Sequence, residues 1–454
     1  MTYARASQTS REIRGLSRRR FFGVLAAGAA GAIAGPYVVP ESARGAGAVS
    51  PPSERVTLGF LGVGRQGLNA NLKPLLSFDD TQVLAVCEVD SWRLENARKT
   101  VEAAYAGKGR AGAGACAAVK DFREVLARPD IDAVMISTPD HWHVPMAIAA
   151  AEAGKDIALE KPITLCIAEG RLLADAVRRH GRVFRTDSEA RSLWFFHKAA
   201  ELVRNGRIGQ LKTIRVGVPR GDVAGGDPRP TPVPPELDHE FWLGPAPAAP
   251  YCTDRVHEPK SYGRPSWMRL RDTCEGMITN WGTHLVDIAQ WGNNTEHTGP
   301  VEVEATGTYP ADGLWNVLID FNINYRYANG VRMTYVMDHP FVRFEGTEGW
   351  VQADWTTRAL TGEPESILKS PTLPGEIHLP FLSEKRDFIN CVKSRARTVA
   401  DAEVGHRTTS ACQIAHIAIQ VGRKLTWDPV TERFPGDEEA NRLLSRFMRA
   451  PWRL

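Results

Sequence analysis

The 454-residue sequence has no C-x-x-C pair, no marked excess of either charge sign and no strongly apolar run long enough for a convincing membrane span. Its formal net charge of +3 implies neither a nucleic-acid surface nor a membrane surface. The seven cysteines are odd in number and scattered, which predicts buried structural thiols rather than a disulfide framework. A hydrophobic fraction of 43% with 24% charged residues is typical of a globular protein.

The first 48 residues have the three parts of a cleaved export signal. Arg18 and Arg19 precede a small-residue apolar run, 23–40, and the A-x-A sequence 46–48 follows it. The paired arginines favour a twin-arginine signal over the alternative, a disordered basic tail. The run is too rich in Ala and Gly for a membrane span, which needs about 20 strongly apolar residues. We therefore expect a periplasmic or otherwise exported protein without membrane contact after cleavage. Because the twin-arginine route exports proteins that have already folded, it is also compatible with a cofactor that is loaded before export.

A glycine-rich turn follows the first β-type run, 56–61, at once. A helix-like stretch, about 68–77, and a second β run, 82–86, come next, with an acid shortly after them. Strand, G-x-G-x-x-G, helix, strand and acid form a dinucleotide-binding unit. The residues predicted to bind the cofactor here are Gly62, Val63, Gly64, Arg65, Gln66, Gly67 and Glu88.

The acid at position 88 bears on which nucleotide is bound. Glu88 stands 21 residues after Gly67, near the spacing at which a carboxylate accepts hydrogen bonds from the adenosine ribose. A carboxylate there repels a 2′-phosphate, so NAD is favoured over NADP. Asp90 could share this role.

Strand and helix patterns alternate up to residue 185. The predicted strands are 133–137, 156–159 and 182–185, and the predicted helices are 121–126, 144–153 and 168–180. This order predicts a doubly wound parallel sheet, in which ligands bind beyond the carboxyl ends of the strands. Thr138-Pro139 and Glu160-Lys161-Pro162 both fall at such ends.

From residue 211 the pattern changes to strands with few helices between them. The β-type runs are 212–218, 301–309, 318–325, 331–337 and 342–345. They predict an α+β domain whose large, open and mostly antiparallel sheet is packed by helices on one side. Residues 219–250 carry nine prolines and are expected to form a functional cover. Helices over 384–393 and 403–424 are expected to pack back on the first domain.

The chain is thus predicted to be an α/β protein of two domains, 54–187 and 188–425, with a tail over 426–454. Several of its motifs in combination resemble the Gfo/Idh/MocA family, named for glucose–fructose oxidoreductase and inositol dehydrogenase. The segments that carry the resemblance are the glycine turn, T-P-D-H-W-H at 138–143, the run ending in L-E-K-P at 162, and residues 202–209, 241–247, 280–287 and 437–444. The resemblance implies a two-domain, nicotinamide-dependent oxidoreductase of sugars or polyols. It also implies a dimer or tetramer formed through the sheet of the second domain.

The resemblance places further residues at the cofactor. They are Thr138, Pro139, Asp140, His143, Glu160, Lys161 and Arg191. Lys161 is expected to touch the substrate hydroxyl and the nicotinamide, with a cis bond to Pro162. His143 would line the nicotinamide pocket, and Asp140 stands where the family often has Asn. The segment Asp187–Arg191 departs from related sequences by its two acids.

His141 and His143 are one residue apart, a spacing at which two histidines can share a metal ion. A metal site needs at least a third ligand, and no Cys/His cluster nearby supplies one. We expect no metal, and His141 is interpreted as a histidine whose hydrogen bonds are satisfied at a strand end.

The segment 274–291 is predicted to be an amphipathic helix on which Asn280, His284 and Asp287 share one face. The family usually has Asp and His at the first two positions, and that His takes the hydroxyl proton as the hydride leaves. Here Asn280 replaces the Asp, which removes a charge that would raise the basicity of His284. Lys161, His284 and Asn280 are the predicted catalytic residues.

Three functions fit these patterns. The first is an NAD-dependent oxidoreductase acting on a sugar or polyol carbinol. The second is a glycosidase that uses NAD transiently, through oxidation of a ring carbon, elimination and reduction. The third is a non-enzymatic sensor, which the retention of Lys161 and His284 disfavours.

Overall fold

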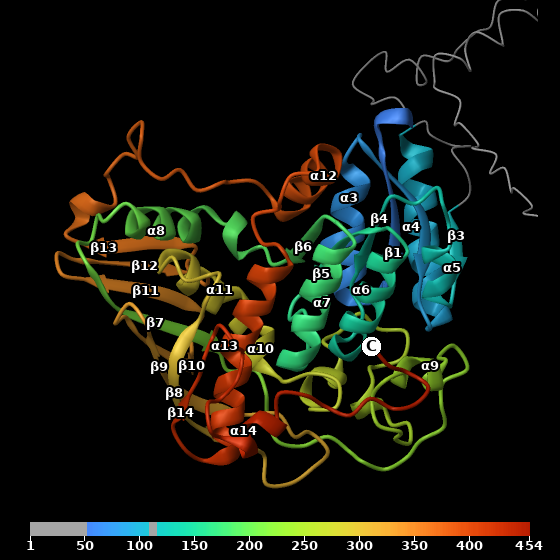
Figure 1. Cartoon of the computed structure of the whole chain (residues 1–454). Coiled ribbons are helices and arrows are strands. Elements are labelled where there is room, and N and C mark those ends of the chain that lie inside the picture. Colours follow the sequence, from blue (N-terminus) through green and yellow to red (C-terminus); the bar gives the residue numbers. More distant parts are fainter. Residues whose placement is uncertain (1–51, 109–115) are drawn as a thin grey trace, which may run out of the picture. The chain divides into compact units, whose positions relative to one another are not determined.

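The computed structural model describes residues 52–108 and 116–454 (Figure 1), so the predicted export signal, 1–48, lies outside the described residues. The first half contains a six-stranded parallel sheet of order β3-β2-β1-β4-β5-β6, which confirms the predicted doubly wound sheet. Its strands are β1 (Val56–Leu61), β2 (Thr81–Cys87), β3 (Ala117–Val119), β4 (Ala133–Ile136), β5 (Asp156–Glu160) and β6 (Phe184–Asp187). The last strand starts later than predicted, so Asp187 rather than Arg185 ends it.

Helices cover both faces of this sheet. One face packs against α3 (Lys73–Ser77), α4 (Ser91–Gly107) and α12 (Glu384–Ser394), and the other against α5 (Phe122–Leu126), α6 (His143–Glu152) and α7 (Ile167–Arg179). The sequence patterns above do not predict α4, because its buried stripe is narrow and contains a small residue, Ala97. The predicted return of α12 to the first sheet is confirmed.

The helix after the glycine turn begins as a π-helix, Gly67–Leu72, and becomes α-helical only at α3. Its last turn has the Lys73 N–H donating to the Leu68 carbonyl, five residues back. Pro74 has no N–H to donate, so the change of hydrogen-bonding register falls just before it. Such wide turns are frequent at functional sites.

The second half contains an eight-stranded sheet of order β13-β12-β11-β7-β10-β9-β8-β14. Only its β7–β10 pair is parallel, which confirms the predicted mostly antiparallel sheet. Its strands are β7 (Leu211–Pro219), β8 (Pro300–Thr308), β9 (Asp320–Tyr327), β10 (Arg332–Asp338), β11 (Phe341–Gly346), β12 (Trp350–Asp354), β13 (Ala359–Glu363) and β14 (Leu425–Thr426). Figure 1 shows α8 (Trp194–Arg204), α11 (Gly282–Gly292) and α13 (Ala402–Val421) on one side of this sheet. The last three strands are short and were not expected from the sequence pattern.

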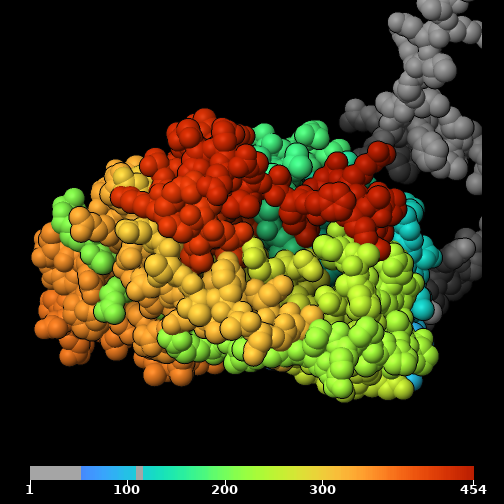
Figure 2. Space-filling view, turned by 90° about the horizontal axis from the view of Figure 1, so that it is seen from below, coloured from blue at the N-terminus to red at the C-terminus, as the bar shows by residue number. Residues whose placement is uncertain are grey.

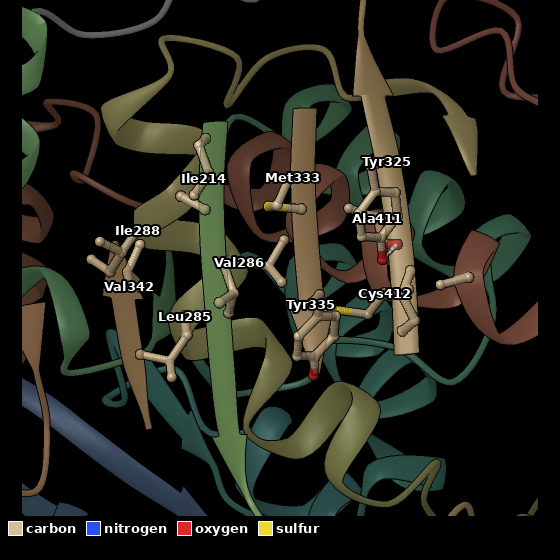
Figure 3. Packing of buried hydrophobic residues seen from close by; sticks show 14 of the residues in the cluster. Ile214, Leu285, Val286, Ile288, Tyr325, Met333, Tyr335, Val342, Ala411 and Cys412 are labelled. Atoms are coloured by element: carbon tan, nitrogen blue, oxygen red, sulfur yellow. Dashed lines mark hydrogen bonds between the residues drawn. The ribbon is translucent and has the colours of Figure 1, made fainter. Parts of the chain in front are cut away.

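The predicted helix over 274–291 is broken at Trp281 into α10 (Met277–Asn280) and α11. One side of α11 is fixed to the sheet, because its Leu285, Val286 and Ile288 belong to the same buried hydrophobic cluster as the strand residues Ile214 and Val342 (Figure 3). The opposite side of the helix is thereby turned toward the first domain.

The proline-rich segment after β7 crosses to the first domain, as expected of a cover. It contains α9 (His239–Leu243), and the Ser91 N–H at the start of α4 donates to the Glu236 carbonyl over 2.9 Å. The chain then ends with α14 (Glu438–Arg442) and a tail whose end lies beside α6 in Figure 1.

All seven cysteines are free and buried, which confirms their interpretation as structural thiols. Within residues 52–108 and 116–454, the helices are too short or too polar to cross a membrane.

Candidate functional site

A cavity of about 490 Å³ lies at the carboxyl ends of the strands of the first sheet and extends to the second domain. The glycine turn and Glu88 line one part of it, and Lys161, His284 and Trp355 line another. The structure therefore brings most of the predicted nucleotide-binding residues and all three predicted catalytic residues to one space.

The glycine turn has the shape that a dinucleotide pyrophosphate requires. Gly62 has φ +84°, and a Cβ there would lie 2.8 Å from the backbone of Ser137. A Cβ on Gly67 would collide with the Gly62 carbonyl oxygen, so this glycine allows the helix to approach the strand. A Cβ on Gly64 would meet nothing within 4 Å, since it would project into open space. That open side is where backbone can approach the phosphates at the helix start.

Glu88 follows β2 and lines the cavity next to this turn. Its Oε2 accepts from the Val63 N–H at 3.0 Å and its Oε1 accepts from the Val89 N–H at 2.9 Å. Burial raises the pKa of Glu88, against the opposing hydrogen bond from Val63 and the charge of Arg93. The backbone thus fixes the carboxylate at the position predicted for ribose recognition.

Asp90 does not share that role. It caps α4 by accepting from the Arg93 N–H at 3.0 Å, and its carboxylate is in direct contact with the Arg93 guanidinium and 3.3 Å from His257 Nε2. Arg93 Nη2 also donates to the Ser261 carbonyl at 2.7 Å. Arg93 therefore ties the segment 257–261, which follows the cover in the chain, to the cavity rim and has little freedom to bind a 2′-phosphate.

The two histidines of the T-P-D-H-W-H motif each contact a backbone carbonyl. The prediction that the hydrogen bonds of His141 are all satisfied is wrong, because its Nδ1 has no partner among the described residues. His141 Nε2 lies 3.0 Å from the Trp242 carbonyl, and His143 Nδ1 lies 2.7 Å from the Pro162 carbonyl. Burial lowers the pKa of His141 to about 3 and that of His143 to about 4, despite these contacts. No group of three or more metal-binding side chains occurs in the part of the chain that the structure describes.

Asp140 is buried in the cavity wall, beside Thr138 and Pro139, which also line the cavity. Burial raises the pKa of Asp140 to about 7, against the opposing effects of the Cys274 thiol and the Lys161 charge. Its Oδ2 atom has no hydrogen-bond partner among the residues that the structure describes. A ligand group that donates a hydrogen bond would satisfy this atom.

Glu160 and Asp187 end neighbouring strands, β5 and β6, in register. Asn71, from the π-helical turn, donates to Glu160 Oε1 at 2.9 Å and to Ser137 Oγ at 2.8 Å. Lys385 of α12 is in direct contact with Asp187. Burial raises the pKa of both acids, that of Asp187 to about 7, and their proximity adds to the effect in Asp187.

Lys161 is half-buried at the meeting of the two domains. Its Nζ donates to the backbone carbonyl of Asn280 at 3.1 Å, and its peptide bond to Pro162 is cis, as predicted. Both Lys161 and Asn280 line the cavity. This hydrogen bond to the main chain of α10 therefore fixes the position of the ammonium group.

His284 is buried on the first-domain side of α11. Its Nδ1 lies 2.8 Å from Ser188 Oγ and 3.6 Å from Glu189 Oε2. Burial lowers the pKa of His284 well below its usual range, and the charge of Lys161 adds to this effect. The imidazole is therefore neutral near pH 7, and Ser188, rather than Asn280, is its hydrogen-bond partner.

Arg191 lies outside the cavity lining and does not reach the predicted cofactor position. Its Nε and Nη2 donate to the two oxygens of Asp287 at 2.6 and 2.8 Å, and Nη1 donates to the Val399 carbonyl at 2.8 Å. This buried pair fixes α11 to the loop after β6. The sequence prediction that Arg191 binds the cofactor is not supported by this arrangement.

The structure adds cavity residues that the sequence analysis does not assign to the site. They are Arg93, Trp142, Glu189, Phe241, Trp242, Trp281 and Trp355. The clustering of aromatics around the H-W-H and F-W-L motifs is a signal that could have suggested a cavity wall. The partnership of Ser188 with His284 has no such signal.

Two family models match the chain. One, described as "Oxidoreductase family, NAD-binding Rossmann fold", matches residues 56–188. The other, described as "Oxidoreductase family, C-terminal alpha/beta domain", matches residues 223–454, half of the chain by itself.

Individual proteins are similar to this chain either over part of its length or at low sequence identity. A glycosyl hydrolase family 109 protein from Shewanella pealeana is 35% identical over 146 residues, which are 32% of this chain and 30% of that protein. The chain thus matches less than a third of the length of this curated relative. The solved aldose-aldose oxidoreductase from Caulobacter crescentus has a TM-score of 0.59 at 17% identity, over 82% of this chain and 99% of that one. The WlbA dehydrogenase from Bordetella pertussis, solved with NADH, has a TM-score of 0.59 at 16% identity, over 82% and 98%.

At such identities the solved structures support the fold alone, whereas the family models cover both halves of the chain. The open glycine turn and the fixed carboxylate of Glu88 suit the nucleotide that the first family model names. The chain therefore belongs to the Gfo/Idh/MocA family of NAD-binding oxidoreductases.

Proposed function

We propose that the protein moves a hydride between NAD and a carbinol carbon of a sugar or polyol. The observation that carries the proposal is the placement of Lys161 and a neutral His284 in the same cavity as the glycine turn. The rings of Trp281 and Trp355 lie 6.0 and 5.5 Å from that of His284. They provide an apolar surface suited to the C–H face of a sugar ring.

In this proposal NAD, when bound, accepts or returns the hydride. Lys161 Nζ, aimed by the Asn280 carbonyl, donates to the oxygen of the reacting hydroxyl and stabilises the negative charge that develops there. His284 accepts the hydroxyl proton at Nε2, in the tautomer whose Nδ1–H donates to Ser188 Oγ. In the opposite direction the same nitrogen returns the proton to the carbonyl oxygen.

The test is NADH formation by purified residues 49–454 with a panel of neutral sugars and polyols. We expect at least one of them to be oxidised. The variant His284→Ala should lower turnover by about a hundredfold or more, the usual contribution of a positioned base, with NADH affinity kept. A wild-type turnover in His284→Ala, or no oxidation of any compound of the panel, would contradict the proposal.

A second candidate is an NAD-assisted glycosidase, supported by the similarity to the family 109 relative over 146 residues. The same two groups would act on a ring hydroxyl that is oxidised only transiently. Incubation with chromogenic glycosides without added NAD separates the candidates. Release of the aglycone by wild type and not by Lys161→Ala would favour the glycosidase.

We also propose that the protein is exported by the twin-arginine route. The support is the sequence Arg18-Arg19 before the apolar run 23–40. Replacing both arginines with lysine should leave the protein in the cytoplasm. Unchanged export of that variant would refute this assignment.

Finally, we propose a homo-oligomer formed through the uncovered face of the eight-stranded sheet. The support is that β9 alternates buried core residues with exposed ones, such as Asn322 and Asn324, which a second sheet could cover. Sedimentation equilibrium should give a dimer or tetramer, and a monomer at all concentrations would exclude it.

A further inference from the structure

The last residues of the chain cross from the second domain to the wall of the cofactor cavity. Figure 1 places the C-terminus beside α6, and Figure 2 shows a red C-terminal segment against the lime-green part of the chain near residue 240. The Ala168 N–H at the start of α7 donates to the Leu444 carbonyl at 3.0 Å, where the crossing begins. From here on, the tail means residues 445–454, the last part of the predicted C-terminal tail, 426–454.

Arg446 binds the tail to the first domain. Its Nε donates to Glu169 Oε1 at 2.6 Å, and its Nη2 lies 3.4 Å from the His141 carbonyl. The side chain of Glu169 is 7% exposed, so this ion pair is shielded from solvent. His141 belongs to the loop after β4, and this loop lines the cavity. The tail thus contacts the cavity-lining loop from its outer side.

Arg449 binds the tail to the cover. Its N–H donates to the Pro245 carbonyl at 3.0 Å, its Nε donates to the Gly244 carbonyl at 2.9 Å, and Nη1 reaches Glu240 Oε1 at 2.5 Å. These three acceptors flank Phe241, a residue of the cavity wall. The cover is thus held to the tail by main-chain as well as side-chain contacts.

Trp452 completes the junction. Its ring packs edge-on against Trp142, with centroids 4.6 Å apart, and stacks on Phe241, with centroids 5.9 Å apart. Trp142 and Phe241 come from different domains and both line the cavity. Gly244 has φ +47°, and a Cβ there would collide with the Trp142 ring, so the cover is already packed as closely as the backbone allows.

The cover has a second attachment on the far side of the nucleotide cavity. There the Asp238 N–H donates to the Val89 carbonyl at 3.1 Å, and the Ser91 N–H donates to the Glu236 carbonyl at 2.9 Å. The tail attachment depends on few side chains, whereas the other is formed by main-chain contacts between residues 89–91 and 236–238.

We propose that the tail is a latch that closes the cover over NAD and sets the rate at which the nucleotide dissociates. Trp452 and Arg449 are its positioning residues, since they act on the cavity through Trp142 and Phe241. The proposal rests on NAD binding and not on the sugar chemistry proposed above.

The experiment measures release of NADH by its fluorescence after dilution of the loaded protein into excess NAD. Residues 49–445, without most of the tail, and the double variant Arg449→Ala, Trp452→Ala are compared with residues 49–454. We expect NADH to dissociate about tenfold faster or more in both, with a smaller change in association, because loss of packing acts mostly on dissociation. The purified variants should also retain less nucleotide after gel filtration.

Phe447→Ala is the matched control, because Phe447 is a tail aromatic with 80% of its surface exposed. It should release NADH at the wild-type rate. If the truncated protein does not fold, the double variant decides the question. Wild-type dissociation in a folded double variant would overturn the latch. If the variants release NADH faster than residues 49–454 but residues 49–454 oxidise no sugar, the latch proposal stands and only the proposed reaction is contradicted.

Discussion

Replacement of His141 by glutamine should change how the stability of the protein depends on pH. His141 is fully buried, and burial lowers the pKa of its imidazole from 6.5 to about 3. In the unfolded chain a histidine has a pKa of about 6.5, so about a quarter of these side chains are protonated at pH 7 and nearly all at pH 5. The folded protein keeps His141 neutral over this interval. The unfolded state therefore gains protons that the folded state does not, and stability falls as the pH falls.

The size of the effect follows from the two pKa values. One pKa unit corresponds to about 1.4 kcal/mol. The titration of His141 therefore lowers the free energy of unfolding by about 2 kcal/mol between pH 7 and pH 5. Glutamine does not titrate, and its amide can still donate to the Trp242 carbonyl that His141 Nε2 contacts. The free energy of unfolding of wild type minus that of His141→Gln should therefore be about 2 kcal/mol lower at pH 5 than at pH 7.

Urea unfolding at pH 7, 6 and 5 provides the measurement, with residues 49–454 and the same buffer ionic strength throughout. The comparison between two proteins is needed because Asp140 and Asp187, whose pKa values are raised to about 7, stabilise the folded state as the pH falls and oppose the histidine in wild type. The exposed His378→Gln controls for the altered charge of the unfolded chain. A wild-type-minus-variant difference that stays constant, or that grows toward pH 5, would refute the reasoning.

Three further outcomes are expected. Glu88→Gln should reduce the preference for NADH over NADPH in fluorescence titrations, because a charge that repels the 2′-phosphate is lost; an unchanged ratio would exclude Glu88 from this role. Lys161→Ala should lower turnover by about a hundredfold or more while NADH affinity stays near wild type, and equal losses of both would make Lys161 a binding residue. Ser188→Ala should lower kcat by roughly two- to tenfold, the equivalent of one net hydrogen bond, with KM unchanged. A wild-type pH profile and kcat in Ser188→Ala would show that Ser188 does not orient His284.

The sequence predicts those parts of the site that local chain geometry determines. The glycine turn and Glu88 lie within one strand–helix–strand unit, and Lys161 lies at a strand end, so their common location follows from topology. The alternation of buried and exposed residues likewise predicts the second sheet, apart from short strands such as β12 and β14.

The remaining contacts depend on residues that are far apart in the chain. Arg191 is bound by Asp287, which lies 96 residues away, and His141 by the Trp242 carbonyl, 101 residues away. No local pattern indicates that Arg191 binds the buried carboxylate of Asp287 rather than a cofactor. The break at Trp281 also escapes periodicity, because α10 and α11 continue the same apolar pattern across it.

The acceptor for Lys161 is the main-chain oxygen of residue 280 rather than its side chain. Any residue that keeps the α10 backbone in place would supply the same acceptor, so the aim of the ammonium group does not depend on the choice between Asn and Asp. The side chain at 280 still lines the cavity, where it can alter the charge that a substrate meets. The charge that residue 280 presents to the cavity and the position of the lysine ammonium therefore depend on different atoms of one residue, so we expect a substitution there to change the first and leave the second in place.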